Sequence, residues 1–156
     1  MRYILKIPLH SVYYLSCYRS SIQKATFFGI SSGGQATSTT INEGGSQIVS
    51  GGGSALQTSV YSGGVQHVLA EGEATSTVVL DQGQQIVESG GVALFTSVFT
   101  GGVQGVWSGA VTSGTTANMG GQIVSSGGST SSSIISSGGS QVVSSGGSAE
   151  VTVVSY

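Results

Sequence analysis

A nineteen-residue repeat runs through most of this chain of 156 residues. Residues 44–62 read GGSQIVSGGGSALQTSVYS, and residues 63–81 continue with GGVQHVLAEGEATSTVVLD. Glycine, glutamine, valine, alanine and threonine fall in the same columns of both lines. A repeat of this kind is typical of solenoids, in which each unit buries its apolar side chains only by stacking on its neighbours.

Glycine-rich doublets set the boundaries of the units, because they fall alternately eight and eleven residues apart. One residue is deleted before Gln122, and residues 33–43 form the second part of an earlier unit. We therefore divide the chain into an N-terminal segment, residues 1–30, and a repeat domain, residues 31–156. The coils expected in that domain are residues 44–62, 63–81, 82–100, 101–119, 120–137 and 138–156.

Two columns do not vary among the six units. The fourth is always glutamine, at Gln47, Gln66, Gln85, Gln104, Gln122 and Gln141. The sixth is always valine, at Val49, Val68, Val87, Val106, Val124 and Val143. The fifteenth column holds threonine or serine, and the seventeenth holds valine, isoleucine or alanine. Fixed positions two residues apart indicate strands with one specified face.

Each unit thus predicts two short strands, around its Q-x-V and T-x-V triplets, with glycine turns between them. The enrichment in β-branched residues excludes an α-helical solenoid. Equivalent columns stacked about 4.8 Å apart bury valine against valine. The sequence predicts an all-β fold, a parallel β-helix (β-solenoid) of about six 19-residue coils, with an irregular N-terminal segment. Its expected core is the sixth and seventeenth columns and the small twelfth column.

The glutamine column is expected to be structural, because stacked amides pass hydrogen bonds from one coil to the next. A row of ligand-binding amides is the alternative. Amides supply neither a charge nor a nucleophile, so this column predicts a ladder and no chemistry.

Charge is unevenly distributed along the chain. Charged residues make up 6% of it, whereas an ordinary soluble domain has about 25%. All lysines and arginines lie in the first thirty residues, and residues 31–156 contain none. The repeats therefore lack the cations that bind phosphate, which argues against a nucleic-acid or anionic-membrane partner.

The N-terminal segment, residues 1–30, carries the only cysteine, Cys17. The repeats consequently have no disulfide framework and no thiolate metal site. The longest uncharged stretch of the segment, residues 7–18, is too short to span a bilayer. We interpret residues 1–30 as an atypical targeting segment or a mis-called start.

No catalytic constellation is evident in the repeats. Glu71, Glu73, Asp81 and Glu88 are the only local acidic group, and His67 stands alone in an otherwise aliphatic fifth column. No G-x-S-x-G motif occurs. We therefore expect no enzyme activity, no catalytic or metal-binding residue, no cofactor and no small-molecule substrate.

Apolar side chains also occupy variable columns of the first four units. Tyr61, Leu80 and Phe99 share the eighteenth column, and Phe95 and Trp107 lie elsewhere in the same units. Exposed apolar stripes mark interaction surfaces. We expect these five residues to form a self-association stripe, with cover by a loop or by the N-terminal segment as the alternative.

Units such as GGSQIVSGGGSALQTSVYS and GGSQVVSSGGSAEVTVVSY resemble the passenger-domain repeats of self-associating autotransporter adhesins, over residues 33–156. The resemblance implies a right-handed β-helical passenger at the surface of a Gram-negative bacterium, attached to the outer membrane within a longer chain. It implies adhesion, autoaggregation and biofilm formation. The implied partners are the same protein on neighbouring cells or host-surface receptors.

Some members of that family carry heptoses on serine or threonine, so the resemblance also implies a glycosyltransferase as a partner. The candidate O-glycosylation sites are Ser125, Ser126, Ser136, Ser137, Ser144 and Ser145.

Two alternatives to an adhesin stay open. One is a free-standing β-solenoid with a structural or ice-binding role, because rows of threonine on a solenoid resemble ice-binding surfaces. Against it, T-x-T pairs occur only at Thr37–Thr39 and Thr75–Thr77. The other is a non-functional gene fragment.

Overall fold

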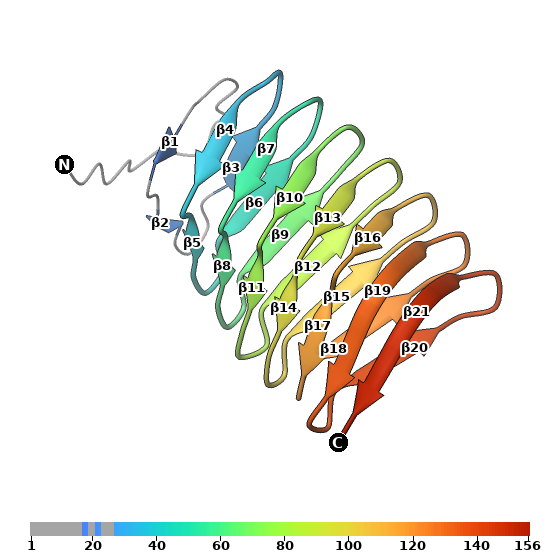
Figure 1. The fold of residues 1–156 in the computed structure, drawn as a ribbon. Helices are drawn as coiled ribbons and strands as arrows, with labels where there is room; N and C mark the ends of the chain where they lie inside the picture. The colour runs from blue at the N-terminus through green and yellow to red at the C-terminus, as the bar shows by residue number, and fades with distance from the viewer. Residues whose placement is uncertain (1–16, 19–20, 23–26) are drawn as a thin grey trace.

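The computed structural model describes residues 17–18, 21–22 and 27–156. These residues form strands and tight turns, which wind into a β-solenoid of stacked turns (Figure 1). All of the strand pairs are parallel. Within this part of the chain, no helix has the length and apolar character needed to cross a membrane.

One side of the solenoid is a seven-stranded sheet that takes one strand from each turn, so the described residues make about seven turns. Each strand covers the Q-x-V triplet or its equivalent, with two side chains pointing inward. In spatial order its strands are β3 (Phe27–Ile30), β6 (Ser46–Val49), β9 (Val65–Val68), β12 (Gln84–Val87), β15 (Val103–Val106), β18 (Gly121–Val124) and β20 (Ser140–Val143).

The remaining strands form a 14-stranded sheet, which bends within each turn and so contributes two rows. The first row is β1 (Cys17–Tyr18), β4 (Gln35–Thr37), β7 (Ser54–Leu56), β10 (Glu73–Thr75), β13 (Val92–Leu94) and β16 (Val111–Ser113). The second row is β2 (Ser21–Ile22), β5 (Thr40–Ile41), β8 (Ser59–Val60), β11 (Val78–Val79), β14 (Ser97–Val98) and β17 (Thr116–Asn118). In the last two turns one long strand spans both rows, β19 (Ser129–Ser136) and β21 (Ser148–Ser155).

Strand register confirms the nineteen-residue period. Gln66 pairs with Gln47 and Gln85 pairs with Gln66, each 19 residues apart. The period drops to 18 residues once, because Ala117 pairs with Val98 but Gly121 pairs with Val103. The missing residue therefore lies between Ala117 and Gly121, at a corner, and the strands on either side keep their register.

Strand pairing also runs across the charge boundary near residue 30. Strand β3 pairs with β6, so that Phe28 lies in the glutamine column beside Gln47 and Ile30 lies in the valine column beside Val49. Phe28 and Ile30 are both buried. The first described turn thus uses the same inward positions as the repeats, with different side chains.

The core is a set of stacked columns in which each side chain lies on its equivalent in the next turn. The sixth-column valines are fully buried from Val49 to Val124, and the seventeenth column is buried from Val60 to Ile135. The expectation that Val143 and Val154 also belong to the core was wrong, because they are 42% and 59% exposed. Both lie in the last turn, which a neighbouring turn covers on one side.

The glutamine column lies inside the solenoid and forms a continuous hydrogen-bonded ladder. The side chains of Gln47 to Gln122 are fully buried. In every step the amide Nε2 of one glutamine donates to the Oε1 of the glutamine one turn earlier, at 2.6–2.9 Å. The ladder begins at Gln47, whose own Nε2 has no hydrogen-bond partner and whose neighbour in the preceding turn is Phe28.

The fifteenth column completes the ladder from the opposite sheet. Thr77 Oγ1 donates to Gln66 Oε1 at 3.0 Å, and Thr96 Oγ1 donates to Gln85 Oε1 at 3.0 Å. The same contact recurs in the other repeat turns, once with serine. Each carbonyl oxygen of the ladder from Gln47 to Gln122 therefore accepts two hydrogen bonds, one from a glutamine and one from a hydroxyl, which offsets the cost of burying an amide.

The two members of a glycine doublet serve different purposes. Gly52, a first member, has φ +79, and a Cβ there would have its nearest neighbour at 3.7 Å. Gly53, the second member of the same doublet, has an ordinary φ, but a Cβ there would lie 2.3 Å from the carbonyl oxygen of Ile30. The first member is needed for its torsion angle and the second for the close approach of two turns.

Candidate interaction surface

The eighteenth column follows the buried seventeenth column and points outward at a corner of the solenoid. Val60, Val79 and Val98 pair in register, which stacks the next residues, Tyr61, Leu80 and Phe99, over three turns. Tyr61 is 40% exposed, Phe99 is 36% exposed and Leu80 is half-buried.

Polar residues bound this apolar column at both ends. Asn42 precedes it and Asn118 follows it in the same register. The eighteenth-column stripe is therefore three turns long.

Phe95 lies at a different corner from this stripe. It occupies the bend between β13 and β14 with φ 55 and is 63% exposed. Its ring covers Gly114 in the next turn, since a Cβ on Gly114 would lie 2.8 Å from Phe95 Cδ1. Three residues, Thr96 to Val98, separate it from Phe99 along the chain.

Trp107 belongs to a third column, which directly follows the C-terminal ends of the strands of the seven-stranded sheet, here β15. It is 54% exposed, and its indole lies beside Gly105, because a Cβ on Gly105 would be 3.2 Å from Trp107 Nε1. The structure thus brings Tyr61, Leu80 and Phe99 together and distributes Phe95 and Trp107 to separate columns.

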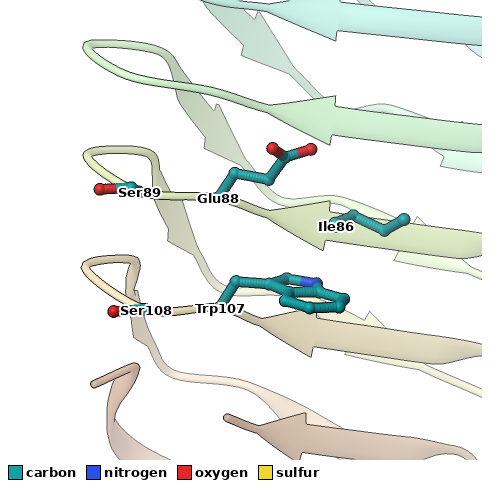
Figure 2. A pocket seen from close by; sticks show the side chains of 5 residues that line it. All are labelled: Ile86, Glu88, Ser89, Trp107 and Ser108. Carbon is teal, nitrogen blue, oxygen red and sulfur yellow. The ribbon is translucent and has the colours of Figure 1, made fainter. Parts of the chain in front are cut away.

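A shallow, open cavity of about 420 Å³ lies around Trp107 (Figure 2). The sequence interpretation missed it, although Trp107 stands two residues after Gly105, the one glycine in the fifth column of the six repeat units. The lining residues come from two adjacent turns and are Ile86, Glu88, Ser89, Trp107 and Ser108.

Glu88 is the charged group of this cavity. Its Oε1 lies 3.1 Å from Nδ1 of His67, which comes from the preceding turn. His67 and Glu88 side chains are 31% and 46% exposed, so this contact lies at the surface. In Figure 2 the carboxylate points away from Trp107, while the aliphatic part of the side chain faces the indole.

The candidate glycosylation serines occupy two corners of the last turns. Ser125, Ser126, Ser144 and Ser145 lie in the turns that follow β18 and β20, and Ser136 and Ser137 lie at the end of β19. Ser126, Ser137, Ser144 and Ser145 are exposed, whereas Ser125 and Ser136 are half-buried. Ser89 and Ser108 occupy the same column as Ser126 and Ser145, so the exposed serine column extends further than the sequence interpretation proposed.

The ice-binding alternative conflicts with the burial of the threonine column. Thr58, Thr77, Thr96 and Thr115 point into the core and are at most 1% exposed. In the T-x-T pairs, Thr39 and Thr77 are buried, so only one threonine of each pair faces outward. A flat, exposed array of threonines is therefore not formed by these columns.

The potential metal ligands among the residues that the structure describes are Cys17, His67 and six carboxylates. No three His, Cys, Asp or Glu side chains gather there in a way that could hold a metal ion. The side chains exposed at the surface of this part of the chain include carboxylates, serine hydroxyls and several large apolar groups.

Comparison with known proteins identifies these turns. A family model described as an adhesin of the bacterial autotransporter system, probable stalk, matches residues 23–83. A crystal structure of a TibC-catalysed, hyper-glycosylated fragment of TibA is similar to this chain with a TM-score of 0.84 and 45% sequence identity. The repeats are autotransporter adhesin passenger repeats of the AIDA and TibA type.

The structural match covers 87% of this chain and 52% of the TibA fragment. This chain therefore spans about half the length of that fragment. A comparison with curated proteins gave no match. Autotransporter adhesin passenger domains are displayed on the outer surface of Gram-negative bacteria. An adhesin stalk with a β-solenoid fold points to a structural, non-enzymatic role for these repeats.

Proposed function

We propose that these autotransporter adhesin repeats form a cell-surface stalk that mediates cell–cell or host adhesion, autoaggregation and biofilm formation. The similarity to the TibA fragment, at 45% identity over 87% of the chain, is the observation that carries this proposal. The fold supports it, because the fixed glutamine and valine columns are buried in every repeat turn but the last, which leaves mainly the variable columns to face outward.

Within this function we propose the eighteenth-column stripe as the self-association surface. Tyr61, Leu80 and Phe99 are contiguous, partly exposed and apolar, which suits a contact between two solenoids lying side by side. Phe95 and Trp107 lie on other columns and are not part of this surface.

Settling of bacterial cells tests both statements. The chain is displayed on a non-aggregating Gram-negative host by fusion to a heterologous export domain, and turbidity of a standing culture is followed. Displayed wild-type repeats are expected to accelerate settling. The triple variant Tyr61→Ser, Leu80→Ser, Phe99→Ser is expected to abolish the effect, and Phe95→Ser serves as the matched control. Equal settling of both variants would remove the stripe from the proposal, and no settling with wild type would remove the adhesive function.

A glycosyltransferase is the second partner that we propose. The TibA fragment is described as hyper-glycosylated by TibC, and this chain presents exposed hydroxyls at Ser126, Ser137, Ser144 and Ser145. Co-expression with such an enzyme is expected to add hexose or heptose masses at these serines in peptide mass spectra, with fewer at half-buried Ser125 and Ser136. Modification confined to the half-buried serines would contradict exposure as the selecting property.

A further inference from the structure

The cavity beside Trp107 owes its shape to one missing side chain. In the fifth column, Ile86 pairs with His67 on one side and with Gly105 on the other. Gly105 in turn pairs with Ile123. Among the repeat units, Gly105 is the fifth-column residue that leaves room on the sheet surface, and the indole of Trp107 occupies it. The ring is therefore held against the sheet while 54% of the residue stays exposed.

Polar and apolar groups surround this ring in an orderly way. Ile86 and the aliphatic part of Glu88 form a wall one turn away, and Ser89 and Ser108 carry hydroxyls at the turn beside it (Figure 2). His67 contacts one carboxylate oxygen of Glu88 and leaves Oε2 available as an acceptor. The cavity thus combines an aromatic platform with carboxylate and hydroxyl groups at its margin.

Charge limits the ligands that suit such a cavity. Residues 31–156 contain no lysine or arginine, so nothing in the repeats compensates a phosphate, a sulfate or a carboxylate. The cavity is also open and shallow, which suits one ring better than an extended peptide. A pyranose has an apolar C–H face that stacks on an aromatic ring and hydroxyls that donate to carboxylate and serine oxygens.

We propose that Trp107, Ile86 and Glu88 form a binding site for a neutral pyranose ring, as found in an uncharged glycan. The indole supports the C–H face, and Ile86 and the aliphatic part of Glu88 close one side. Glu88 Oε2, at the rim on the side of His67, accepts a hydrogen bond from a hydroxyl that extends past the edge of the stacked ring. His67 is a positioning residue, because its contact fixes the other carboxylate oxygen. The site lies apart from the eighteenth-column stripe and does not depend on the proposed self-association.

Trp107 is the single tryptophan of the chain, so tryptophan fluorescence reports on this cavity alone. The purified protein is titrated with methyl β-galactopyranoside, methyl α-mannopyranoside and, as a cationic probe, Nα-acetyl-lysine amide. Saturation-transfer NMR with the same glycosides identifies which sugar protons contact the protein. A saturable fluorescence change with at least one glycoside, with transfer to the C–H protons of one sugar face, is the expected result.

Variants separate stacking from charge. Trp107→Ala is expected to weaken glycoside binding about tenfold in the NMR experiment, whereas Trp107→Phe retains most of it. Glu88→Gln keeps an acceptor oxygen and is expected to lower affinity only a few-fold. Phe95→Ala removes an exposed aromatic ring that lies outside both this cavity and the eighteenth-column stripe, and it is expected to bind as wild type. Circular dichroism of each variant checks the fold.

Three results would overturn the proposal. The first is no saturable response to either glycoside in the wild-type protein. The second is a response to the lysine probe alone that disappears in Glu88→Gln, which would indicate a cationic side chain as the ligand. The third is unchanged glycoside affinity in Trp107→Ala. The settling experiment tests the stripe and the glycoside titrations test this cavity, so failure of one proposal is distinguished from failure of the other.

Discussion

Gln85 Nε2 donates a hydrogen bond to Gln66 Oε1 at 2.9 Å, and both side chains are completely buried. The core therefore contains a column of polar side chains beside its column of valines. Their value lies in mutual satisfaction, because a buried amide without partners costs about 1–3 kcal/mol per missing hydrogen bond.

Replacing a central ladder residue is expected to be strongly destabilising. Gln85→Leu leaves Gln104 Nε2 and Thr96 Oγ1 without their acceptor, and we expect a loss of about 3 kcal/mol in the free energy of unfolding. Urea denaturation measures it. Gln84→Leu, at the exposed neighbouring position of β12, is the matched control and is expected to change stability by about 0.5 kcal/mol at most. Equal midpoints for the two variants would contradict a stabilising ladder.

The first ladder residue is expected to be more tolerant than the central one. Gln47 Nε2 has no partner and faces the turn that carries Phe28. Gln47→Leu removes that unsatisfied donor, and we expect it to cost about 1–2 kcal/mol less than Gln85→Leu. Parallel urea titrations of the two variants provide the comparison. A greater loss at Gln47 would show that its amide has a partner in solution.

Met119 occupies a corner position with φ 55 where the preceding turn has Gly101 with φ 71. A left-handed backbone costs a non-glycine residue about 1–2 kcal/mol, and glycine removes this strain. Part of the gain in stability is lost again, because glycine has more conformational entropy in the unfolded state. Met119→Gly is therefore expected to raise the free energy of unfolding by about 0.5–1 kcal/mol. Met119→Ala keeps the strain and is expected to give no gain, which thermal unfolding of the two variants will decide.

The two glycines of a doublet are expected to differ in their response to alanine. Gly52→Ala meets only the torsional penalty and is expected to cost about 1 kcal/mol. Gly53→Ala places a Cβ 2.3 Å from the carbonyl oxygen of Ile30, so the turns must separate, and we expect a cost of about 3 kcal/mol or more. Denaturation midpoints in the reverse order would refute the steric explanation.

The period and inward columns of the solenoid were predictable because each column repeats six times. Gln66 and Val68 identify one strand by their spacing alone, and the register confirms it. The turn that contains Phe28 was not predictable, because neither its aromatic ring nor its surroundings match the repeat columns. Val143 and Val154 were misassigned, since a column reports which side chains point inward but not whether a turn covers both sides.

The surface was harder to predict than the core. Column numbers separate Trp107 from Tyr61, but an expectation that rests on apolar character alone assigns both to one stripe. The cavity depends on the combination of Trp107 with Gly105 in one turn and Ile86 in the next. Such a combination arises from the positions where repeats differ, which a consensus of columns discards.

The direction of the glutamine ladder has an electrical consequence. Backbone dipoles of a sheet largely cancel, because successive peptide groups point to opposite neighbours. The ladder amides all point the same way, with nitrogen toward the N-terminal turn and oxygen toward the C-terminal turn. Their dipoles add along the axis, so the solenoid has a permanent axial dipole with its positive pole at the N-terminal end. Two solenoids lying side by side therefore differ in electrostatic energy between the parallel and the antiparallel arrangement.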